Sequence, residues 1–244
     1  MAGMSLQNKV AIITGASRGI GEAIAMACAK EGADVGLLAR SEADLEAVAE
    51  GARAHGVQAL PLVTDVSDEA QVQSAMAQIK ATWGRIDVLV NCAGIGVFAP
   101  IAETSTDDWD RVMAVNARGP FLVCREAVPL LTRDGQACIV NIASVVGVKG
   151  YVHQGAYTAS KHALMGLTKV LSQELQPEGI RVHALCPGGV DTDLVTKARP
   201  DLDTSVLMTP DEVARIAMFL IQQPGNAIID QINVRRAVSS PWFS

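Results

Sequence analysis

Hydrophobic and polar positions along the chain follow two alternating patterns. Short runs rich in branched apolar residues leave few polar positions, which is typical of strands buried on both faces of a sheet. Such runs lie at residues 10–14, 34–39, 57–63, 86–91, 137–143, 180–186 and 226–234. Because these runs lack a continuous polar face, we predict a sheet that helices cover on both sides.

The segments between these runs repeat apolar residues at helical spacing. They cover residues 19–31, 42–54, 68–82, 107–133, 154–176 and 210–222. Parallel strands joined by right-handed helical crossovers form a doubly wound fold. We therefore predict an α/β chain, a single Rossmann-type domain over residues 1–244 with a seven-stranded parallel sheet. Ligands of such sheets bind beyond the carboxyl ends of the strands, so the residues after each run are the first candidates for a site.

The composition argues against several classes of partner. The 244 residues are 49% hydrophobic, which allows a sizeable core, and the formal charge of -6 offers no basic surface for nucleic acid. Residues 1–9 lack the apolar core of a signal peptide, and the longest uncharged run, residues 88–102, is too short to span a bilayer. We expect neither a nucleic acid nor a membrane as partner.

The cysteines favour a reducing compartment. They are odd in number, widely scattered and flanked by apolar residues, a pattern of buried thiols rather than of a disulfide frame or a zinc site. They are Cys28, Cys92, Cys124, Cys138 and Cys186. The pair Asp191 and Asp193 is too little to hold a cation. We therefore expect a cytoplasmic protein without a bound metal.

The first strand ends in a glycine-rich turn, TGASRGIG, at residues 14–21. Glycines at a strand-to-helix turn allow a phosphate to approach the backbone, and the helix directs its N–H groups and positive end at that anion. The spacing G-x3-G-x-G differs from the common G-x-G-x-x-G dinucleotide motif, and such glycines can also serve packing alone. The expected cofactor contacts here are Gly15, Ser17, Arg18, Gly19, Ile20 and Gly21.

This turn matches the TGxxxGIG motif in full, and the chain here resembles the short-chain dehydrogenase/reductase family, in its single-domain oxidoreductase branch. Nearly the whole chain is similar to 3-oxoacyl-acyl-carrier-protein reductases of that family. Residues 91–94, NCAG, resemble the family's NNAG motif, with Cys92 as a departure. The resemblance implies that Asp65 and Val66 contact the adenine and that Asn91, Ala93 and Gly94 border the cofactor.

The end of the second strand bears on the choice of cofactor. A ribose 2'-hydroxyl favours a carboxylate acceptor there, whereas a 2'-phosphate favours cations. The strand ends in Ala39 and Arg40, and Arg40 together with Arg18 could hold a phosphate from two sides. We therefore predict NADP as the cofactor, with NAD less favoured. The alternative is that both arginines are only solvated.

The stretch YTASK at residues 157–161 provides the candidate chemistry. Tyr157 and Lys161 are four residues apart and share one face of a helix. Ser144 ends the fifth strand, and the resemblance adds Asn116 to a catalytic set with Ser144, Tyr157 and Lys161. A free phenol is a poor base at neutral pH, and we expect the Lys161 ammonium and an oxidised nicotinamide to lower the pKa of Tyr157.

These residues suggest a hydride-transfer reaction. Tyr157 would donate a proton to the oxygen of a carbonyl that receives hydride, and Ser144 would hydrogen-bond that oxygen. The resemblance implies that Tyr157 and Lys161 also contact the nicotinamide ribose and that Asn116 holds a water that returns protons. It further implies that the residues after the sixth strand orient the nicotinamide. These are Pro187, Gly188, Val190 and Thr192.

The substrate pocket should be mostly apolar. Its expected lining follows the fourth, fifth and sixth strands, and only a short segment separates Thr192 from the next helix, which suggests an open site. The expected lining residues are Ile95, Val97, Phe98, Val145, Val146, Tyr151 and residues 194–208. His153 is expected to be a partly exposed loop residue.

The end of the chain departs from the family pattern. It reads INVRRAVSSPWFS, without the glycine pair that usually follows the seventh strand, which weakens an assignment to acyl-carrier substrates. Arg235, Arg236, Trp242 and Phe243 could pack on a neighbouring subunit, because arginine and aromatic residues are enriched at interfaces. The resemblance implies a homotetramer, or a homodimer, formed through the helices at 107–133 and 154–176.

The sequence as a whole predicts an NADP-dependent oxidoreductase that transfers hydride between NADPH and a carbonyl or secondary-alcohol substrate. Candidate substrates are ketones, β-ketoesters and 3-oxoacyl compounds. Three alternatives remain open: an NAD-dependent alcohol dehydrogenase, an epimerase or dehydratase that uses the dinucleotide transiently, and a dinucleotide-sensing or scaffold protein without turnover.

Overall fold

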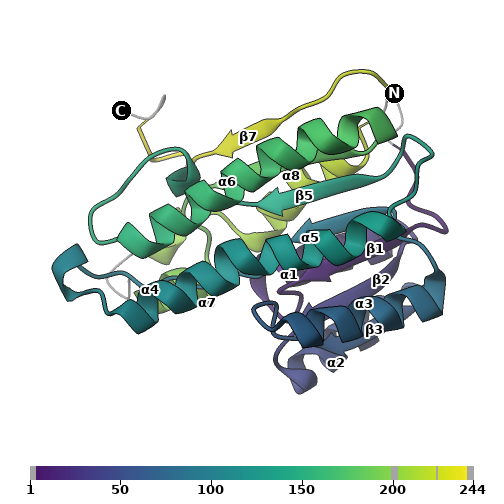
Figure 1. Ribbon diagram of the computed structural model, residues 1–244, viewed down its shortest axis with the longest axis horizontal. Coiled ribbons are helices and arrows are strands. Elements are labelled where there is room, and N and C mark those ends of the chain that lie inside the picture. The colour runs from purple at the N-terminus through teal and green to yellow at the C-terminus, as the bar shows by residue number, and fades with distance from the viewer. Residues whose placement is uncertain (1–3, 199–202, 224, 241–244) are drawn as a thin grey trace.

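The computed structural model describes residues 4–198, 203–223 and 225–240. A seven-stranded parallel sheet forms its centre, with strand order β3-β2-β1-β4-β5-β6-β7 (Figure 1). The strands are β1 (Val10–Thr14), β2 (Asp34–Ala39), β3 (Ala59–Val63), β4 (Val88–Asn91), β5 (Cys138–Ile142), β6 (Arg181–Pro187) and β7 (Gln231–Val234). The prediction of a seven-stranded parallel sheet of Rossmann type is confirmed.

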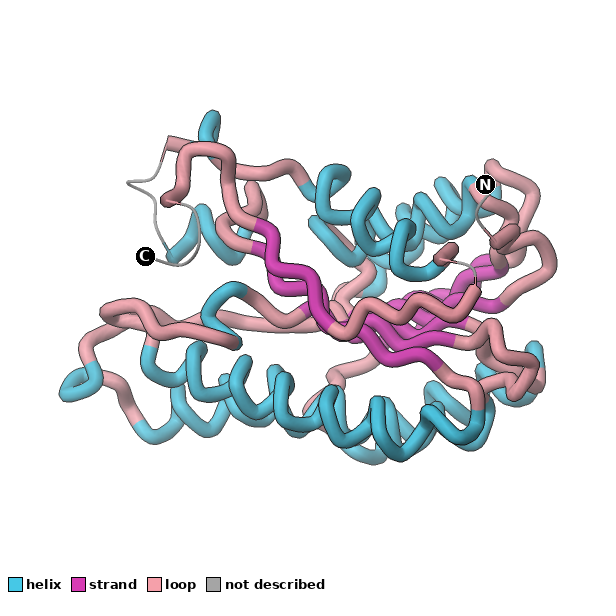
Figure 2. The backbone as a smooth tube through the Cα atoms, turned by 90° about the horizontal axis from the view of Figure 1, so that it is seen from above, coloured by secondary structure: helices cyan, strands magenta, loops and turns pink. Residues whose placement is uncertain are grey.

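Helices cover both faces of this sheet (Figure 2). The α-helices are α1 (Gly19–Lys30), α2 (Glu42–Arg53), α3 (Glu69–Trp83), α4 (Thr106–Met113), α5 (Gly119–Ala127), α6 (Gly155–Leu175), α7 (Asp193–Ala198) and α8 (Pro210–Ile221). Among them, α3, α5 and α6 cover the face that is turned to the viewer in Figure 1. The described residues include no helix of the length and apolar character that a bilayer crossing requires.

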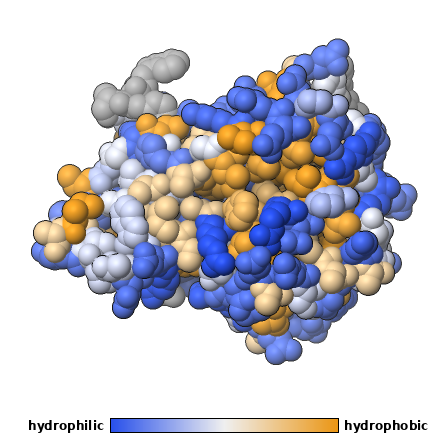
Figure 3. All heavy atoms as spheres, in the orientation of Figure 1, coloured by the Kyte–Doolittle hydropathy of each residue, from blue (hydrophilic) through white to orange (hydrophobic). Residues whose placement is uncertain are grey.

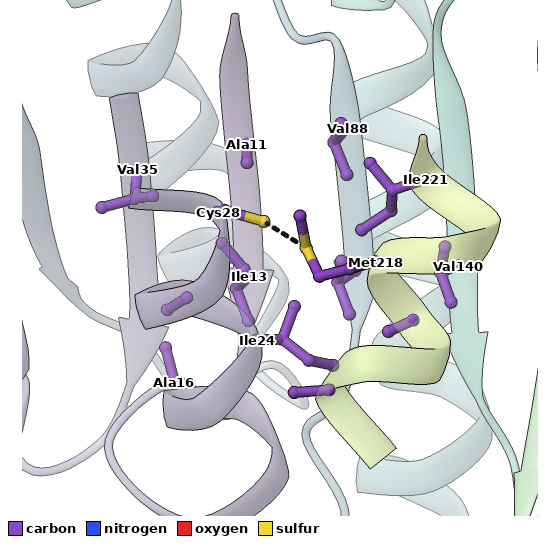
Figure 4. Close-up of a cluster of buried hydrophobic side chains, with 14 of the residues drawn as sticks. Ala11, Ile13, Ala16, Ile24, Cys28, Val35, Val88, Val140, Met218 and Ile221 are labelled. Atoms are coloured by element: carbon purple, nitrogen blue, oxygen red, sulfur yellow. Dashed lines mark hydrogen bonds between the residues drawn. The ribbon is translucent and has the colours of Figure 1, made fainter. Parts of the chain in front are cut away.

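Alternating side chains of the strands form two separate cores, because successive residues of a strand point to opposite faces. Ile13 of β1 packs in the cluster that contains Ile24 of α1 and Met218 of α8 (Figure 4). Its neighbour Ile12 packs in the other cluster, with Ile79 of α3. Both β1 residues are fully buried. The continuous apolar runs in the sequence therefore reflect two buried faces.

The strand order places a crevice at the carboxyl ends of β1 and β4. These strands are neighbours in the sheet, but the chain leaves β1 toward β2 on one side and resumes at β4 on the other. Connections that depart in opposite directions leave a crevice between them, and ligands of doubly wound sheets bind there. Thr14 at the end of β1 lies opposite Asn91 at the end of β4.

The prediction of a single helix over residues 107–133 is wrong in detail. The structure divides it into α4, a π-helical turn (Ala114–Arg118), α5 and a 3-10 turn (Val128–Leu130). Pro120 near the start of α5 has no backbone N–H to donate, which disfavours a regular α-helical ladder at this point. The wide turn contains Asn116, so the irregularity lies in the candidate site.

Two further boundaries differ from the predicted ones. The strand predicted over residues 226–234 is shorter, because β7 is an edge strand and begins only at Gln231, where it pairs with Ala184 of β6. Helix α7 was not predicted, since its six residues are too few to show helical periodicity.

Candidate active site

A cleft of about 1160 Å³ lies along the carboxyl ends of β1, β2, β3 and β4 and along the segment after β6. Its lining contains the predicted cofactor residues Gly15, Ser17, Arg18, Gly19, Ile20, Gly21, Arg40, Asp65, Val66, Ala93, Gly94 and Thr192. It also contains residues for which the sequence carried no motif, among them Asp108, Arg111 and Val115. Asp108 and Arg111 lie on α4 and Val115 lies in the π-helical turn that follows it.

Some predicted cofactor residues lie behind the cleft surface. Asn91 is 2% exposed, and its side-chain amide donates to Asn141 Oδ1 at 2.8 Å and to Cys124 Sγ at 3.2 Å. Val190 is 3% exposed. Pro187 and Gly188 belong to the end of β6 and its exit, where Gly188 N donates to Val234 O at 2.7 Å. Asn91 therefore contributes to the sheet below the cleft rather than to the cleft surface.

The glycine turn is packed too closely for side chains. Gly15 has φ of +68°, and a Cβ built on it would lie 2.8 Å from backbone atoms of Ala93. A Cβ on Gly21 would lie 2.2 Å from Gly15 O. Thr14 Oγ1 accepts from the N–H groups of Cys92 and Ala93 at 3.0 and 3.1 Å, which joins the ends of β1 and β4. The result is a cradle of bare backbone at the start of α1.

The two arginines of the predicted phosphate clamp differ in their partners. Arg40 is exposed and has no ion pair among the described residues. Arg18 is paired instead with a carboxylate: its Nη1 lies 2.8 Å from Asp193 Oδ2. Arg40 is thus available to a phosphate, whereas Arg18 would first have to leave a carboxylate, and the joint clamp stays a prediction.

Three of the four predicted catalytic residues come together beyond β5. Ser144 follows β5, Tyr157 lies in the first turn of α6, and Lys161 lies one turn later on the same helix. The Ser144 hydroxyl faces the Tyr157 phenol and acts on its pKa. Phe98, from the loop after β4, packs edge-on against the Tyr157 ring with 5.6 Å between the ring centroids. Phe98 therefore packs on the Tyr157 ring, and the phenol hydroxyl lies next to Ser144.

The phenol pKa runs opposite to the prediction. Tyr157 is only half-buried as a whole residue, but desolvation of its hydroxyl raises the pKa to about 12, although Ser144 acts to lower it. Lys161 is not among the named causes of this shift; its Nζ donates to Ile142 O at 2.9 Å and lies 5.8 Å from the centroid of the tyrosine ring. In the chain by itself, Tyr157 therefore retains its proton at neutral pH.

Lys161 is a buried amine. It is 4% exposed, and desolvation by burial lowers its pKa from 10.5 to about 8. Its surroundings offer a backbone carbonyl rather than a carboxylate. A buried ammonium without a counter-ion is costly, so the protein places a readily titratable amine next to the candidate reaction centre.

Asn116 is held by its side chain in the π-helical turn. Its Nδ2 donates to Ile95 O at 2.8 Å and to Ser160 Oγ at 3.0 Å, and its Oδ1 accepts from Ile95 N at 2.9 Å. A Cβ on Gly94 would lie 3.4 Å from Asn116 Oδ1 and 3.6 Å from Lys161 Nζ. Because both amide N–H groups are occupied by protein atoms, the side chain orders the loop after β4 rather than donating to a water.

The pKa of Lys161 predicts a pH-dependent difference in stability between the wild type and Lys161→Met. Between pH 8 and 10.5 the unfolded lysine is still protonated and the folded one is largely neutral, so folding releases a proton. The free energy of unfolding of the wild type relative to Lys161→Met should therefore rise with pH, by up to about 1.4 kcal/mol per pH unit.

Urea unfolding of both variants at pH 7, 8, 9 and 10 measures this difference. The five cysteines are present in both proteins, so their ionisation in the unfolded state is common to both. A difference that is constant across this range would contradict a depressed lysine pKa.

The predicted substrate-binding residues are only partly brought together. Ile95, Val97 and Phe98 line the cleft, and so does Leu194. Val146 is buried at 3% exposure. Tyr151 is exposed, and Lys149 Nζ lies 4.8 Å from its ring centroid. Part of the predicted segment, residues 199–202, lies outside the described residues.

The other surface predictions have mixed outcomes. His153 is exposed in a loop, as expected, and adopts a φ of +63°. Arg235 is also exposed, and its Nη1 donates to the carbonyl oxygens of Arg236, Ala237 and Ser239. It orders the chain after β7 within one subunit. Trp242 and Phe243, which were also predicted to pack on a neighbour, lie outside the described residues.

Comparison with known proteins agrees with this arrangement. Residues 9–203 match the short chain dehydrogenase family. The chain is 40% identical over 197 residues to a 3beta-hydroxysteroid dehydrogenase of Mediterraneibacter gnavus, covering 80% of this chain and 71% of the relative. It is 35% identical over 237 residues to the 3-oxoacyl-(acyl-carrier-protein) reductase FabG of Thermotoga maritima, covering 94% and 96%.

A solved structure supports the same conclusion. The crystal structure of a metagenomic short-chain oxidoreductase in complex with NADP superposes with a TM-score of 0.83 at 34% identity, covering 96% of this chain and 100% of that one. The chain belongs to the short-chain dehydrogenase/reductase family of oxidoreductases. The family predicted from the glycine turn and the YTASK stretch is thereby confirmed.

Proposed function

We propose that the protein is an NADP-dependent oxidoreductase that reduces a carbonyl group of a small-molecule substrate to a secondary alcohol. The observation that carries this proposal is the meeting of Ser144, Tyr157 and Lys161 beside a dinucleotide-sized cleft. The glycine turn lines the cleft at the positive end of α1, where backbone N–H groups suit a pyrophosphate. Arg40 lies on the cleft without an ion pair among the described residues, so it suits a 2'-phosphate.

The nicotinamide of NADPH, when bound, supplies the hydride for this reaction. Tyr157 donates its proton to the oxygen that becomes the alcohol, and Ser144 donates a hydrogen bond to the same oxygen. With a pKa of about 12, Tyr157 is protonated at neutral pH, which is the state that a proton donor needs. Lys161 lies one helical turn away and, with a pKa near 8, can pass a proton toward the tyrosine.

The proposed substrates are ketones, β-ketoesters or 3-oxoacyl compounds. The apolar residues Ile95, Val97 and Phe98 support a substrate with an apolar body next to its carbonyl group. The two named relatives act, by their names, on a hydroxysteroid and on a 3-oxoacyl group, and both names imply interconversion of carbonyl and alcohol.

A substrate panel tests the proposed function. NADPH absorbance at 340 nm is followed with ketones, β-ketoesters and diketones, and the same panel is repeated with NADH. Turnover of at least one compound with NADPH is expected. Nucleotide binding with flat traces throughout the panel would favour the sensor or scaffold alternative, and turnover with NADH alone would favour the NAD-dependent dehydrogenase.

We further propose a single cytoplasmic domain that assembles as a homotetramer or homodimer. Phe121 on α5 is 46% exposed and Val170 on α6 is 51% exposed. Figure 3 shows apolar atoms gathered over the face on which α5 and α6 lie. Apolar side chains on such a face support the pairing of subunits. The native mass in solution is the measurement that tests this assembly.

Replacing Arg40 with aspartate should reverse the cofactor preference. The variant loses the cation proposed for the 2'-phosphate and gains an acceptor for a 2'-hydroxyl, so NADPH should bind about 10- to 100-fold more weakly while NADH binds equally well or better. Dissociation constants from calorimetry measure both effects. Arg215→Asp makes the same charge change at an exposed position of α8 and should alter neither constant. An unchanged NADPH constant in Arg40→Asp would refute the phosphate contact.

A further inference from the structure

An ion pair connects the two sides of the cleft. Arg18 is the N-cap residue of α1 and Asp193 is the first residue of α7, and both line the cleft. Their side chains are 57% and 55% exposed, and Arg18 Nη1 lies 2.8 Å from Asp193 Oδ2. A second contact lies beside the pair, since a Cβ on Gly19 would be 3.2 Å from Thr192 Cγ2. The glycine turn therefore meets the segment after β6 at two neighbouring points.

This pair places a carboxylate on one of the two arginines that the sequence assigns to the 2'-phosphate of NADP. Arg18 and Arg40 both line the cleft. The Arg18 guanidinium can donate its N–H groups to the carboxylate of Asp193 or to a phosphate group. If one of these anions accepts from all the paired N–H groups, none of them is left for the other. Arg40 faces no such competition among the described residues, because none of them forms an ion pair with it.

We propose that Asp193 is a determinant of cofactor specificity, because it competes with the 2'-phosphate of NADP for Arg18. The inference rests on the proposed NADP-dependent function and adds a residue to it. Binding of NADPH requires Arg18 to exchange the carboxylate for the phosphate, whereas binding of NADH leaves the pair in place. Asp193 therefore lowers the preference for NADPH over NADH that Arg18 and Arg40 create together.

The expected effect is modest, because both partners are more than half exposed and water screens their attraction. Exposed ion pairs of this kind change an equilibrium constant by about 1.5- to 5-fold. The variant Asp193→Asn keeps the size of the side chain and removes its charge. NADPH should therefore bind about 1.5- to 5-fold more tightly to Asp193→Asn than to the wild type, with little change for NADH.

The test is a set of dissociation constants for NADPH and NADH, measured by calorimetry on the full chain at low ionic strength. Asp191→Asn is the matched control, because Asp191 also lines the cleft, is exposed, and forms no ion pair within the described ranges. It reports the general effect of removing one negative charge near the cofactor. Arg18→Ala and the double variant Arg18→Ala/Asp193→Asn complete a mutant cycle, and thermal unfolding verifies that each variant is folded.

Three results would support the inference together: a gain for NADPH in Asp193→Asn, a smaller gain in Asp191→Asn, and no gain from Asp193→Asn when Arg18 is alanine. Equal gains for NADPH and NADH, equal gains in the two asparagine variants, or a gain that persists without Arg18 would overturn it. In each of those cases NADPH still binds, so the proposed function stands. A wild type that binds neither dinucleotide would defeat the proposed function and this inference at once.

Discussion

Replacing Tyr157 with phenylalanine should lower kcat by about 10²- to 10⁴-fold, the usual contribution of a positioned general acid. The variant keeps the ring that packs against Phe98 and loses only the hydroxyl that faces Ser144. Because the ring contact remains, thermal stability and the dissociation constant of NADPH should change little. Initial rates with a ketone found in the substrate panel, together with calorimetry of NADPH, measure the two effects separately.

Tyr151→Phe is the matched control, because Tyr151 is the other tyrosine of the chain and its side chain is exposed. It should keep nearly full activity if Tyr157 is the proton donor. Substantial activity in Tyr157→Phe would remove that tyrosine from proton transfer. An equal loss of activity in both variants would indicate that the substitutions act through the apolar surroundings of the substrate and not through loss of the proton donor.

Replacing Gly21 with alanine should abolish measurable NADPH binding and destabilise the fold. The new Cβ would lie 2.2 Å from Gly15 O and 2.7 Å from Gly15 C, which are backbone atoms that cannot rotate away. Relief of this overlap has to displace the glycine turn, at a cost of about 1–3 kcal/mol or more in the free energy of unfolding. Calorimetry with NADPH and urea unfolding measure both consequences.

Gly166→Ala separates this clash from the general effect of adding a methyl group. Gly166 lies on the exposed side of α6, and a Cβ there meets no atom within 4 Å. Alanine in the middle of a helix should stabilise the protein by about 0.5–1 kcal/mol relative to glycine, with NADPH binding unchanged. Normal NADPH binding by Gly21→Ala would show that the phosphate does not use the glycine turn.

Much of the site could be predicted because its chemistry depends on short spacings. The glycines of the turn and the pair Tyr157 and Lys161 lie within single stretches whose local conformation the sequence indicates. Their expected places, at the start of α1 and on one face of α6, agree with the structure. Ser144 was found for a related reason, since it follows a buried strand at the carboxyl edge of the sheet.

The errors concern properties that depend on residues distant in the chain. The long helix after β4 was predicted as continuous, but a π-helical turn over Ala114–Arg118 divides it. Asn91 was assigned to the cofactor by its motif, but its side-chain nitrogen donates to Asn141 and Cys124 on neighbouring elements. Arg18 was expected to be available to a phosphate, but Asp193, far along the chain, is its partner.

The pKa of Tyr157 shows most clearly what the spacing left open. The spacing of four positions from Tyr157 to Lys161 places both on one helical face, but it does not say where the lysine side chain points. The structure directs Lys161 Nζ to Ile142 O, so burial rather than the ammonium governs the phenol. The sign of the pKa change therefore depends on a contact between α6 and β5.

The sequence by itself determined the α/β fold, the family and the residue types of the site, because strand and helix periodicity and short motifs are local properties of the chain. The tertiary structure alone decided which side chains meet, which way the pKa values of Tyr157 and Lys161 move, and how Arg18 is engaged. Burial, desolvation and ion pairing arise between elements that are distant in sequence, and their balance is set only when the strands and helices pack.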